Sequence, residues 1–147
     1  MVMIRSYQTQ DRDILTHIFR MNVPKYFDSN EEKDFIEYLV TYGNTYLVLE
    51  ENQRIIGGSG YYFNDQDSSG RITWIFFHPD HSGRGLGRMA VEYCLNQLRL
   101  DDRIRELIVT TSQHAYRFFE KFGYKVHYIQ KDYWGKGLDL YEMKMQP

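Results

Sequence analysis

Three glycines within five residues, Gly83, Gly85 and Gly87, interrupt this chain between an apolar segment and a helical pattern. The preceding segment, RITWIFFHP, is rich in β-branched and aromatic residues and predicts a strand over 71–79 that Pro79 ends. After the glycines, residues recur on one helical face: Leu86, Ala90, Tyr93, Cys94, Gln97 and Leu98. The chain must therefore contain a strand, a glycine turn and a helix in direct succession.

This turn has the properties of an anion-binding site. The first N–H groups of a helix have no partner within it, and the helix dipole places partial positive charge there. Arg84 and Arg88 add mobile positive charge. The Walker pattern fails because Arg88 and Met89 follow Gly87, and the dinucleotide pattern fails because position 88 is not glycine. A plain tight turn rarely needs three glycines and a helix start, so we expect a pyrophosphate site.

The other segments alternate irregularly between helical and strand patterns. Further strands are expected over 3–7, 45–50, 54–63, 105–111, 124–132 and 138–145. Helices are expected from Thr9 through Phe19, from Asp28 or Ser29 to Gly43, from Gly85 to Leu98, and over 112–123. This order contains antiparallel hairpins and no strict alternation of strand and helix, so it predicts an α+β fold.

Length and charge narrow the class of protein. The 147 residues suit one domain, 1–147, and a net charge of −2 gives no electrostatic footprint for nucleic acid. No apolar run approaches the ~18 residues of a membrane span, and the N-terminus lacks a basic region followed by an apolar block. Cys94 has no partner for an internal disulfide. We therefore expect a soluble, cytoplasmic protein without nucleic-acid or membrane partners.

Two segments together resemble one family. HPDHSGRGLGR is similar to the signature of the GCN5-related N-acetyltransferases, and SQHAYRFFEKFGY resembles that family's second landmark. The resemblance implies a mostly antiparallel, twisted mixed sheet of six to seven strands with about four helices. It also implies that Ser82, Leu86 and the residues around them hold the pyrophosphate of acetyl-CoA, with contacts from Gly83, Arg84, Gly85, Gly87 and Arg88.

The resemblance also implies how the thioester carbonyl is polarised. In the family, a main-chain N–H of the fourth strand, beside a bulge, donates to this carbonyl. The corresponding strand end is Phe76, Phe77 and His78, with Phe77 as the expected donor, and all three are expected to contact the cofactor. No metal is expected, since His78 and His81 lack a third ligand at a suitable spacing.

The second landmark departs from the family pattern. Ser112 stands where the family often has Asn, Ser82 stands where it has Gln or Arg, and Phe119 replaces its frequent tyrosine acid. Ser112, Tyr116 and Phe119 are expected to share a helical face beside the cofactor, which makes Tyr116 the nearest phenol. Tyr116 is then either the acid or a packing residue. His78 is a candidate base or a turn cap, and water is the alternative base.

The acceptor site is expected at the connection between the first two helices, where Tyr26 and Phe27 either bind substrate or pack in the core. The leading interpretation is an acetyl-CoA-dependent N-acetyltransferase acting on a small or peptide amine. A non-catalytic acyl-CoA binder or sensor and an unrelated phosphate-binding module are the alternatives. A homodimer through edge strands near the C-terminus stays open.

Overall fold

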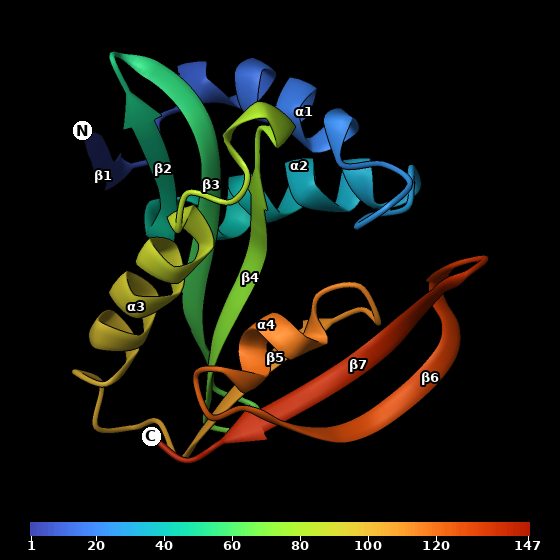
Figure 1. Ribbon diagram of the computed structural model, residues 1–147. Coiled ribbons are helices and arrows are strands. Elements are labelled where there is room, and N and C mark those ends of the chain that lie inside the picture. The colour runs from blue at the N-terminus through green and yellow to red at the C-terminus, as the bar shows by residue number, and fades with distance from the viewer.

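The structure, a computed structural model, describes all 147 residues and contains one twisted seven-stranded sheet in the order β1-β2-β3-β4-β5-β7-β6 (Figure 1). The strands are β1 Val2–Ser6, β2 Tyr46–Glu51, β3 Arg54–Asn64, β4 Ser69–Phe77, β5 Glu106–Thr111, β6 Lys125–Gly135 and β7 Leu138–Met145. Only β4 and β5 pair in parallel. The expected α+β class and the mostly antiparallel sheet are confirmed.

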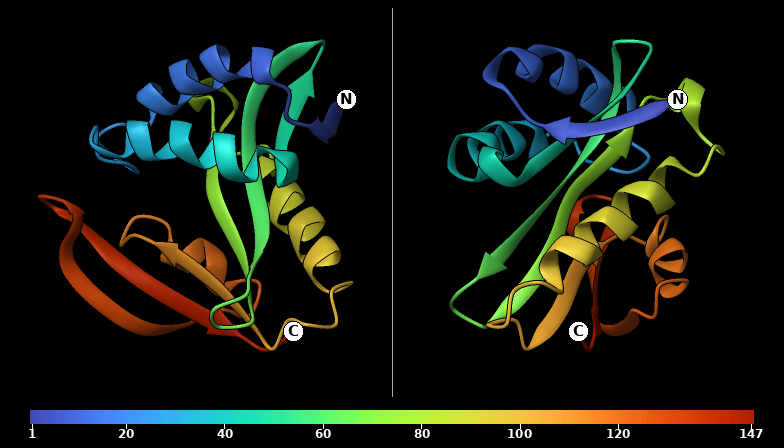
Figure 2. Two further views of the ribbon diagram at one scale, coloured as in Figure 1. Left: turned by 180° about the vertical axis from the view of Figure 1, so that it is seen from behind. Right: turned by 90° about the vertical axis from the view of Figure 1, so that its left-hand side faces the viewer.

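Four helices cover the two faces of this sheet. They are α1 Arg12–Met21, α2 Glu31–Tyr42, α3 Leu86–Leu98 and α4 Tyr116–Glu120, and short 3-10 turns lie at Thr9–Asp11, Gly43–Thr45 and Pro79–His81. Figure 2 shows α1 and α2 on one face and α3 and α4 on the other. Because successive side chains of a strand point to opposite faces of the sheet, each face has its own hydrophobic core. The first core contains Leu15, Phe19, Phe35, Tyr46 and Phe76, and the second contains Leu47, Ile72, Val91, Leu95, Val109, Phe119 and Met143.

The first helix starts differently from the sequence prediction. Gln8, not Thr9, precedes the first turn, and its N–H donates to Asp11 Oδ2 at 2.8 Å. The second helix begins after Asn30 rather than after Asp28 or Ser29. At the first turn the physical reason is that Asp11, three residues on, accepts the Gln8 N–H. Before α2, Glu31 accepts the Asp28 N–H at 2.8 Å and Asp28 accepts the Asn30 N–H at 2.9 Å, so Asp28 makes the capping bonds although the helix itself starts at Glu31.

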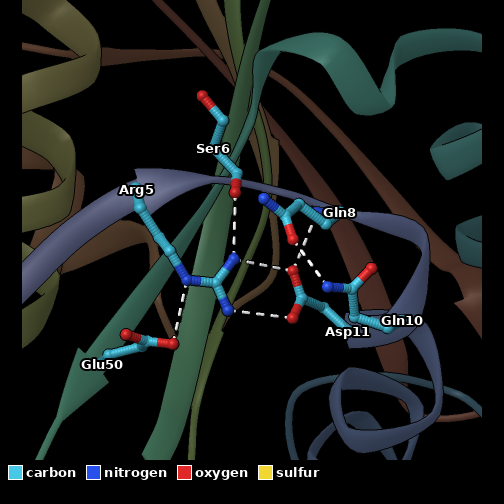
Figure 3. A network of polar contacts seen from close by, with 6 residues as sticks. All are labelled: Arg5, Ser6, Gln8, Gln10, Asp11 and Glu50. Atoms are coloured by element: carbon cyan, nitrogen blue, oxygen red, sulfur yellow. Dashed lines mark hydrogen bonds and ion pairs between the residues drawn. The ribbon is translucent and has the colours of Figure 1, made fainter. Parts of the chain in front are cut away.

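Arg5 joins three segments of the N-terminal part of the fold (Figure 3). Its guanidinium donates to both carboxylate oxygens of Asp11, at 2.8 and 2.9 Å, and to Glu50 Oε1 at 2.9 Å. Asp11 is only 4 % exposed, and its hydrogen bond from Arg5 lowers the pKa of its carboxyl below the ordinary value of 3.8. The bidentate pair fixes the start of α1 against β1 and β2.

The fourth helix is much shorter than the predicted segment 112–123. It spans only Tyr116–Glu120, because Ser112–Ala115 form a turn in which Ser112 Oγ accepts the His114 N–H at 3.2 Å. A serine hydroxyl that bonds to a nearby N–H competes with helical pairing. Ser112 therefore precedes the helix, and the expected common face of 112, 116 and 119 does not form as one helical surface.

The sheet splits between β4 and β5. The two strands pair only from Ser69–Ile72 to Glu106–Val109 and then diverge, as the V-shaped arrangement in Figure 1 shows. The cause is a bulge in β4, where Trp74 has φ 50° and the β3 register shifts between Gly58 and Gly60. Beyond Ile72, one edge of β4 and one edge of β5 have no strand between them.

The first strand of the β6–β7 hairpin is longer than the predicted segment 124–132. Strand β6 continues to Gly135, and the Trp134 indole Nε1 donates to the Thr111 carbonyl oxygen at 3.0 Å, at the end of β5. Gln113 Nε2 donates a hydrogen bond to the Gly137 oxygen at 2.8 Å, and Gln113 Oε1 accepts the Asp139 N–H at 2.9 Å. None of the helices has the length and apolar character that crossing a membrane requires.

Candidate active site

The glycine turn presents a row of free main-chain donors. No N–H group from Gly83 to Arg88 has a hydrogen-bond acceptor elsewhere in the chain. The first helical bond of α3 runs from the Met89 N–H to the Gly85 oxygen at 3.1 Å. Six successive unpaired donors at the positive end of a 13-residue helix constitute a strong anion site.

The three glycines of this turn serve two different purposes. Gly83 and Gly85 have φ of +78° and +77°, a left-handed conformation that favours glycine, and no atom would lie within 4 Å of a Cβ at either position. Gly87 is instead required by packing, since a Cβ there would lie 2.9 Å from Phe118 Cζ. The open side of the turn thus lies at Gly83 and Gly85.

The two arginines of the turn are not the mobile charges that the sequence suggested. Arg84 is bound bidentately by Glu51, at the end of β2, and contacts His81 Nδ1 at 2.9 Å. The bond from Arg84 lowers the pKa of Glu51. Arg88 pairs with Glu92 at 2.8 Å and is highly exposed. Both arginines are thus paired with carboxylates of the protein itself. The unpaired main-chain N–H groups are therefore the principal groups of this turn that could bind an anion.

Two other residues expected in the turn contribute less than predicted. The Ser82 N–H is already donated to the Pro79 oxygen at 3.2 Å, within the 3-10 turn. Leu86 buries its side chain between the sheet and α3, so only its N–H faces the anion site. The free donors therefore begin at Gly83.

The edge of β4 presents main-chain donors to the split. His78 donates its N–H to the Ile56 oxygen at 2.8 Å, and antiparallel pairing alternates along the strand. The N–H and C=O groups of Phe76 and His78 thus face β3, whereas those of Ile75 and Phe77 face the split. Ile75 directly follows the bulge at Trp74.

This geometry corrects the expected contacts at the strand end. Phe76 buries its ring in the core under α1 and α2, with 3 % exposure, and pairs its main chain with Gly58, so it has no group directed at the split. The His78 ring accepts the Asp80 N–H at Nδ1, at 3.1 Å, and caps the turn. That bond occupies the ring nitrogen that a base would use.

Asn22 fixes the strand end at the split. It is buried directly after α1, and its Nδ2 donates to the Ile18 oxygen at 2.9 Å and to the Phe77 oxygen at 3.0 Å. The second bond confirms that the polar groups of Phe77 point away from β3. Asn22 therefore positions the part of β4 that carries the free N–H groups.

Residues of the second landmark lie on the other side of the split. Tyr116 stacks on Tyr141, with ring centroids 4.6 Å apart, and its hydroxyl accepts from Arg117 Nε at 3.2 Å. Phe119 is 2 % exposed in the core under α3 and α4, and Ser112 is buried. Of the three predicted residues, only Tyr116 carries a phenol; its ring stacks on Tyr141 and its hydroxyl oxygen accepts from Arg117.

The expected acceptor residues divide between core and surface. The Phe27 ring centroid lies 4.9 Å from that of Phe19 and 5.9 Å from that of Trp74, on which it stacks. Phe27 therefore packs in the core, which was one of the two roles that the sequence allowed. Tyr26 is 38 % exposed, with Lys25 Nζ 5.1 Å from its ring centre. The next residue, Asp28, touches Gly135 so closely that a Cβ there would overlap its carboxylate.

Sequence reasoning missed several residues of this site. Ile75, Asn22 and Glu51 have no recognisable local motif, because each acts through a partner that is distant in the chain or through its main chain. A signal existed only for Asn22, which stands at the end of a helical pattern and before Pro24, where a capping side chain is common.

The chain thus combines a split mixed sheet with a turn of unpaired N–H groups between β4 and α3. A family model described as the acetyltransferase (GNAT) family matches residues 12–124. No curated protein sequence matches the chain. The chain belongs to the GNAT acetyltransferase family.

Solved structures share this fold across nearly the whole chain. Ard1 from Thermoplasma volcanium has a TM-score of 0.82 at 14% identity and covers 99% of this chain and 97% of its own. A ribosomal-protein-alanine N-acetyltransferase from Brucella melitensis has a TM-score of 0.75 at 19% identity, with 99% of each chain covered. The protein yncA from Salmonella typhimurium, solved with acetyl-CoA, has a TM-score of 0.76 at 20% identity and covers 99% of this chain and 94% of its own.

Proposed function

We propose that the protein is an acetyl-CoA-dependent N-acetyltransferase that transfers the acetyl group directly from the thioester to an amine. One observation carries the proposal: the free donors from Gly83 to Arg88 lie at the end of β4, whose edge presents the Ile75 and Phe77 N–H groups to the split. A ligand with a diphosphate at one end and amide and thioester groups along its arm matches this order of donors.

Each donor has a distinct proposed role. The six N–H groups of the turn bind the diphosphate, and the Phe77 N–H binds the pantetheine arm. The Ile75 N–H, beside the bulge, polarises the thioester carbonyl, which moves this role two residues earlier than Phe77, its position in the sequence prediction. Because a main-chain donor is independent of side-chain identity, the bulge matters more for this role than the residue type.

The proposed transfer needs little acid catalysis. The neutral amine attacks the carbonyl carbon, the C–S bond breaks, and the electron pair leaves with the thiolate of coenzyme A. Alkyl ammonium groups have a pKa of about 10.4 and thiols about 8.5, so removal of the amine proton is the harder step near neutral pH. Since the His78 ring already caps a turn, we assign this proton to water in the split.

A second candidate function has one specific observation in its favour. Phe119 occupies the family's frequent tyrosine position and lies in the core, so this position supplies no proton to the thiolate. A non-catalytic acyl-CoA binder with the same fold would tolerate this replacement. The two functions share the anion site and differ only in turnover.

The experiment combines binding and turnover. Calorimetry with acetyl-CoA is compared for Gly83→Asp and Gly83→Asn, which have equal size and both tolerate a positive φ. Because a Cβ at Gly83 meets no atom within 4 Å, both side chains fit, and only Asp places a negative charge beside the diphosphate. We expect Gly83→Asp to bind acetyl-CoA about tenfold or more weakly than Gly83→Asn.

Turnover is then measured as release of free coenzyme A thiol across a panel of amines. Binding with amine-dependent release supports the N-acetyltransferase. Binding without release from any amine supports the acyl-CoA binder. Equal affinity of the two Gly83 variants would contradict the proposed position of the diphosphate.

A further inference from the structure

The face of the sheet opposite α3 and α4 is left uncovered at the split. Ile72, Val109 and Met143 point into the core under α3 and α4, so their neighbours Thr73, Thr110 and Glu142 point to the opposite face. The core under α1 and α2 contains no residue of β5, β6 or β7. Thr110 is accordingly exposed although β5 is a central strand.

These residues form one row across the split. Glu142 lies opposite Thr110 of β5 and, on its other side, opposite Tyr128 of β6. The last paired row is Ile72, Val109 and Met143, in which a strand spacing of about 4.8 Å places Met143 roughly 10 Å from β4. Glu142 follows one residue further, where the split opens, and its side chain lies on the uncovered face. An amine that enters the split from this face passes this carboxylate.

Glu142 is a carboxylate without a counter-ion. It is half-buried and takes part in no ion pair or side-chain hydrogen bond. Two cations of the same face are engaged by other carboxylates: Lys144 pairs with Glu106 at 3.5 Å, and Arg71 pairs with Asp67 at 2.7 Å. Lys125, opposite Lys144 in β6, forms no ion pair with Glu142. An unpaired carboxylate at this place attracts an ammonium group and repels a second carboxylate.

Aromatic side chains surround the row. Trp74 and Tyr62 flank it on the β3–β4 side. The ring centroids of Trp74 and Tyr38 are 6.2 Å apart, and those of Tyr62 and Tyr42 are 4.7 Å apart. Tyr128 lies beside Glu142, and the Trp134 indole lies at the end of β5. Flat apolar walls around one polar anchor fit a ligand with an aromatic body and one charged end.

The end of the β6–β7 hairpin closes one side of this space. Gly135 touches the carboxylate of Asp28 in the connection between α1 and α2, so the hairpin and that connection meet beside the split (Figure 1). Asp28 accepts the Asn30 N–H at 2.9 Å and has no cation partner either. A closed side of this kind favours a small acceptor over an extended peptide, which needs a groove open at both ends.

We infer that the acceptor is a small primary amine that carries an aromatic group and no carboxylate, and that Glu142 is the residue that binds its ammonium group. The bound ammonium group gives its proton to water in the split, and the neutral nitrogen then attacks the thioester. The inference rests on the proposed N-acetyltransferase function. Trp74 and Tyr128 hold the aromatic group, and Glu142 sets the preference for a singly cationic acceptor.

The test compares four acceptors by thiol release at saturating acetyl-CoA: phenethylamine, butylamine, phenylalanine and a tetrapeptide that begins with phenylalanine. We expect kcat/KM for phenethylamine to exceed that for each of the others by about tenfold or more, the value of one charge-assisted bond or one buried ring. Preference for phenylalanine, the peptide or butylamine would overturn the inference.

Glu142→Gln and Glu120→Gln provide the matched pair. Both remove one negative charge, but Glu120 is exposed on α4, on the opposite face of the sheet. Glu142→Gln should raise KM for phenethylamine about tenfold or more and reduce the discrimination against phenylalanine, with little change in kcat. Glu120→Gln should match the unsubstituted protein, and an unchanged KM in Glu142→Gln would overturn the assignment.

Acetyl-CoA affinity, measured by calorimetry for each variant, separates this inference from the function on which it rests. If the protein does not bind acetyl-CoA, the proposed function itself fails. If acetyl-CoA binds with unchanged affinity in Glu142→Gln but other amines are turned over better than phenethylamine, only the acceptor inference fails. If acetyl-CoA binds and no amine is turned over, both the acceptor inference and the N-acetyltransferase function fail.

Discussion

The side chain of Asn22 and the main chain of Phe77 are joined by a hydrogen bond of 3.0 Å, which ties the end of α1 to the end of β4. Leucine at position 22 keeps the size of the side chain but leaves the Phe77 and Ile18 oxygens without this donor. We therefore expect Asn22→Leu to lower the free energy of unfolding by about 1–3 kcal/mol and to weaken acetyl-CoA binding.

Urea unfolding and calorimetry measure the two effects of Asn22→Leu. The control is Asn96→Leu, since Asn96 is exposed on α3 and should change stability by no more than about 0.5 kcal/mol. Equal stability and equal acetyl-CoA affinity in the two variants would show that the Asn22 bond does not position β4.

Tyr116→Phe decides between the two roles that the sequence left open for this phenol. Because the ring stacks on Tyr141 and the hydroxyl is bonded to Arg117, we expect a packing role and a change in kcat below about threefold. The measurement is thiol release at saturating amine. A loss of more than about tenfold would instead assign the proton-donor role to Tyr116.

The ion pair of Arg5 and Asp11 predicts a specific dependence of stability on pH. The hydrogen bond from Arg5 lowers the pKa of Asp11 in the folded state, so its contribution is complete above the unfolded value of 3.8. That contribution is lost as the pH falls through the lowered folded-state pKa. Asp11→Asn should reduce the free energy of unfolding at pH 7 by about 1.5–3 kcal/mol.

Denaturant unfolding of both proteins from pH 7 to pH 2.5 tests this sign. The difference in unfolding free energy should be constant above about pH 5 and should shrink below about pH 4. A difference that grows as the pH falls would contradict the assignment of the shift to Arg5.

Cys94 should be unreactive in the folded protein. It is fully buried beneath α3, and burial raises the pKa of its thiol to about 12, so the reactive thiolate is scarce at neutral pH. A thiol reagent should label no group in the native protein and one group in denaturant. Rapid native labelling would show that the packing between α3 and β3 opens readily, and it would add a background to the thiol-release assays.

The sequence predicted most elements of the fold because their signals are local. The apolar stripe of α3, the β-branched run of β4 and the alternation in β7 each lie within one segment, and each was located to within a few residues. The two motifs of the family resemblance are local in the same way. These signals were sufficient for the class of fold, the order of its elements and the position of the glycine turn between β4 and α3.

The rest of the site depends on contacts between distant segments. The bond from Arg84 to Glu51 spans 33 residues and the bond from Asn22 to Phe77 spans 55, so neither leaves a periodic pattern. The bulge at Trp74 arises from pairing with β3 and is invisible in the letters of β4. For these reasons the sequence analysis treated Arg84 as a free charge and did not include Ile75, the carbonyl donor that we propose.

The proposed function requires main-chain N–H groups from Gly83 to Arg88 to hold the diphosphate of acetyl-CoA. A titration of the 15N-labelled protein with acetyl-CoA, followed through its backbone amide resonances, tests this directly. We expect the amides of residues 83–88 to shift most, and 3′-phospho-ADP, the nucleotide half of coenzyme A, to shift them as well. Binding of acetyl-CoA that leaves these six amides unchanged and perturbs another region of the protein would contradict it.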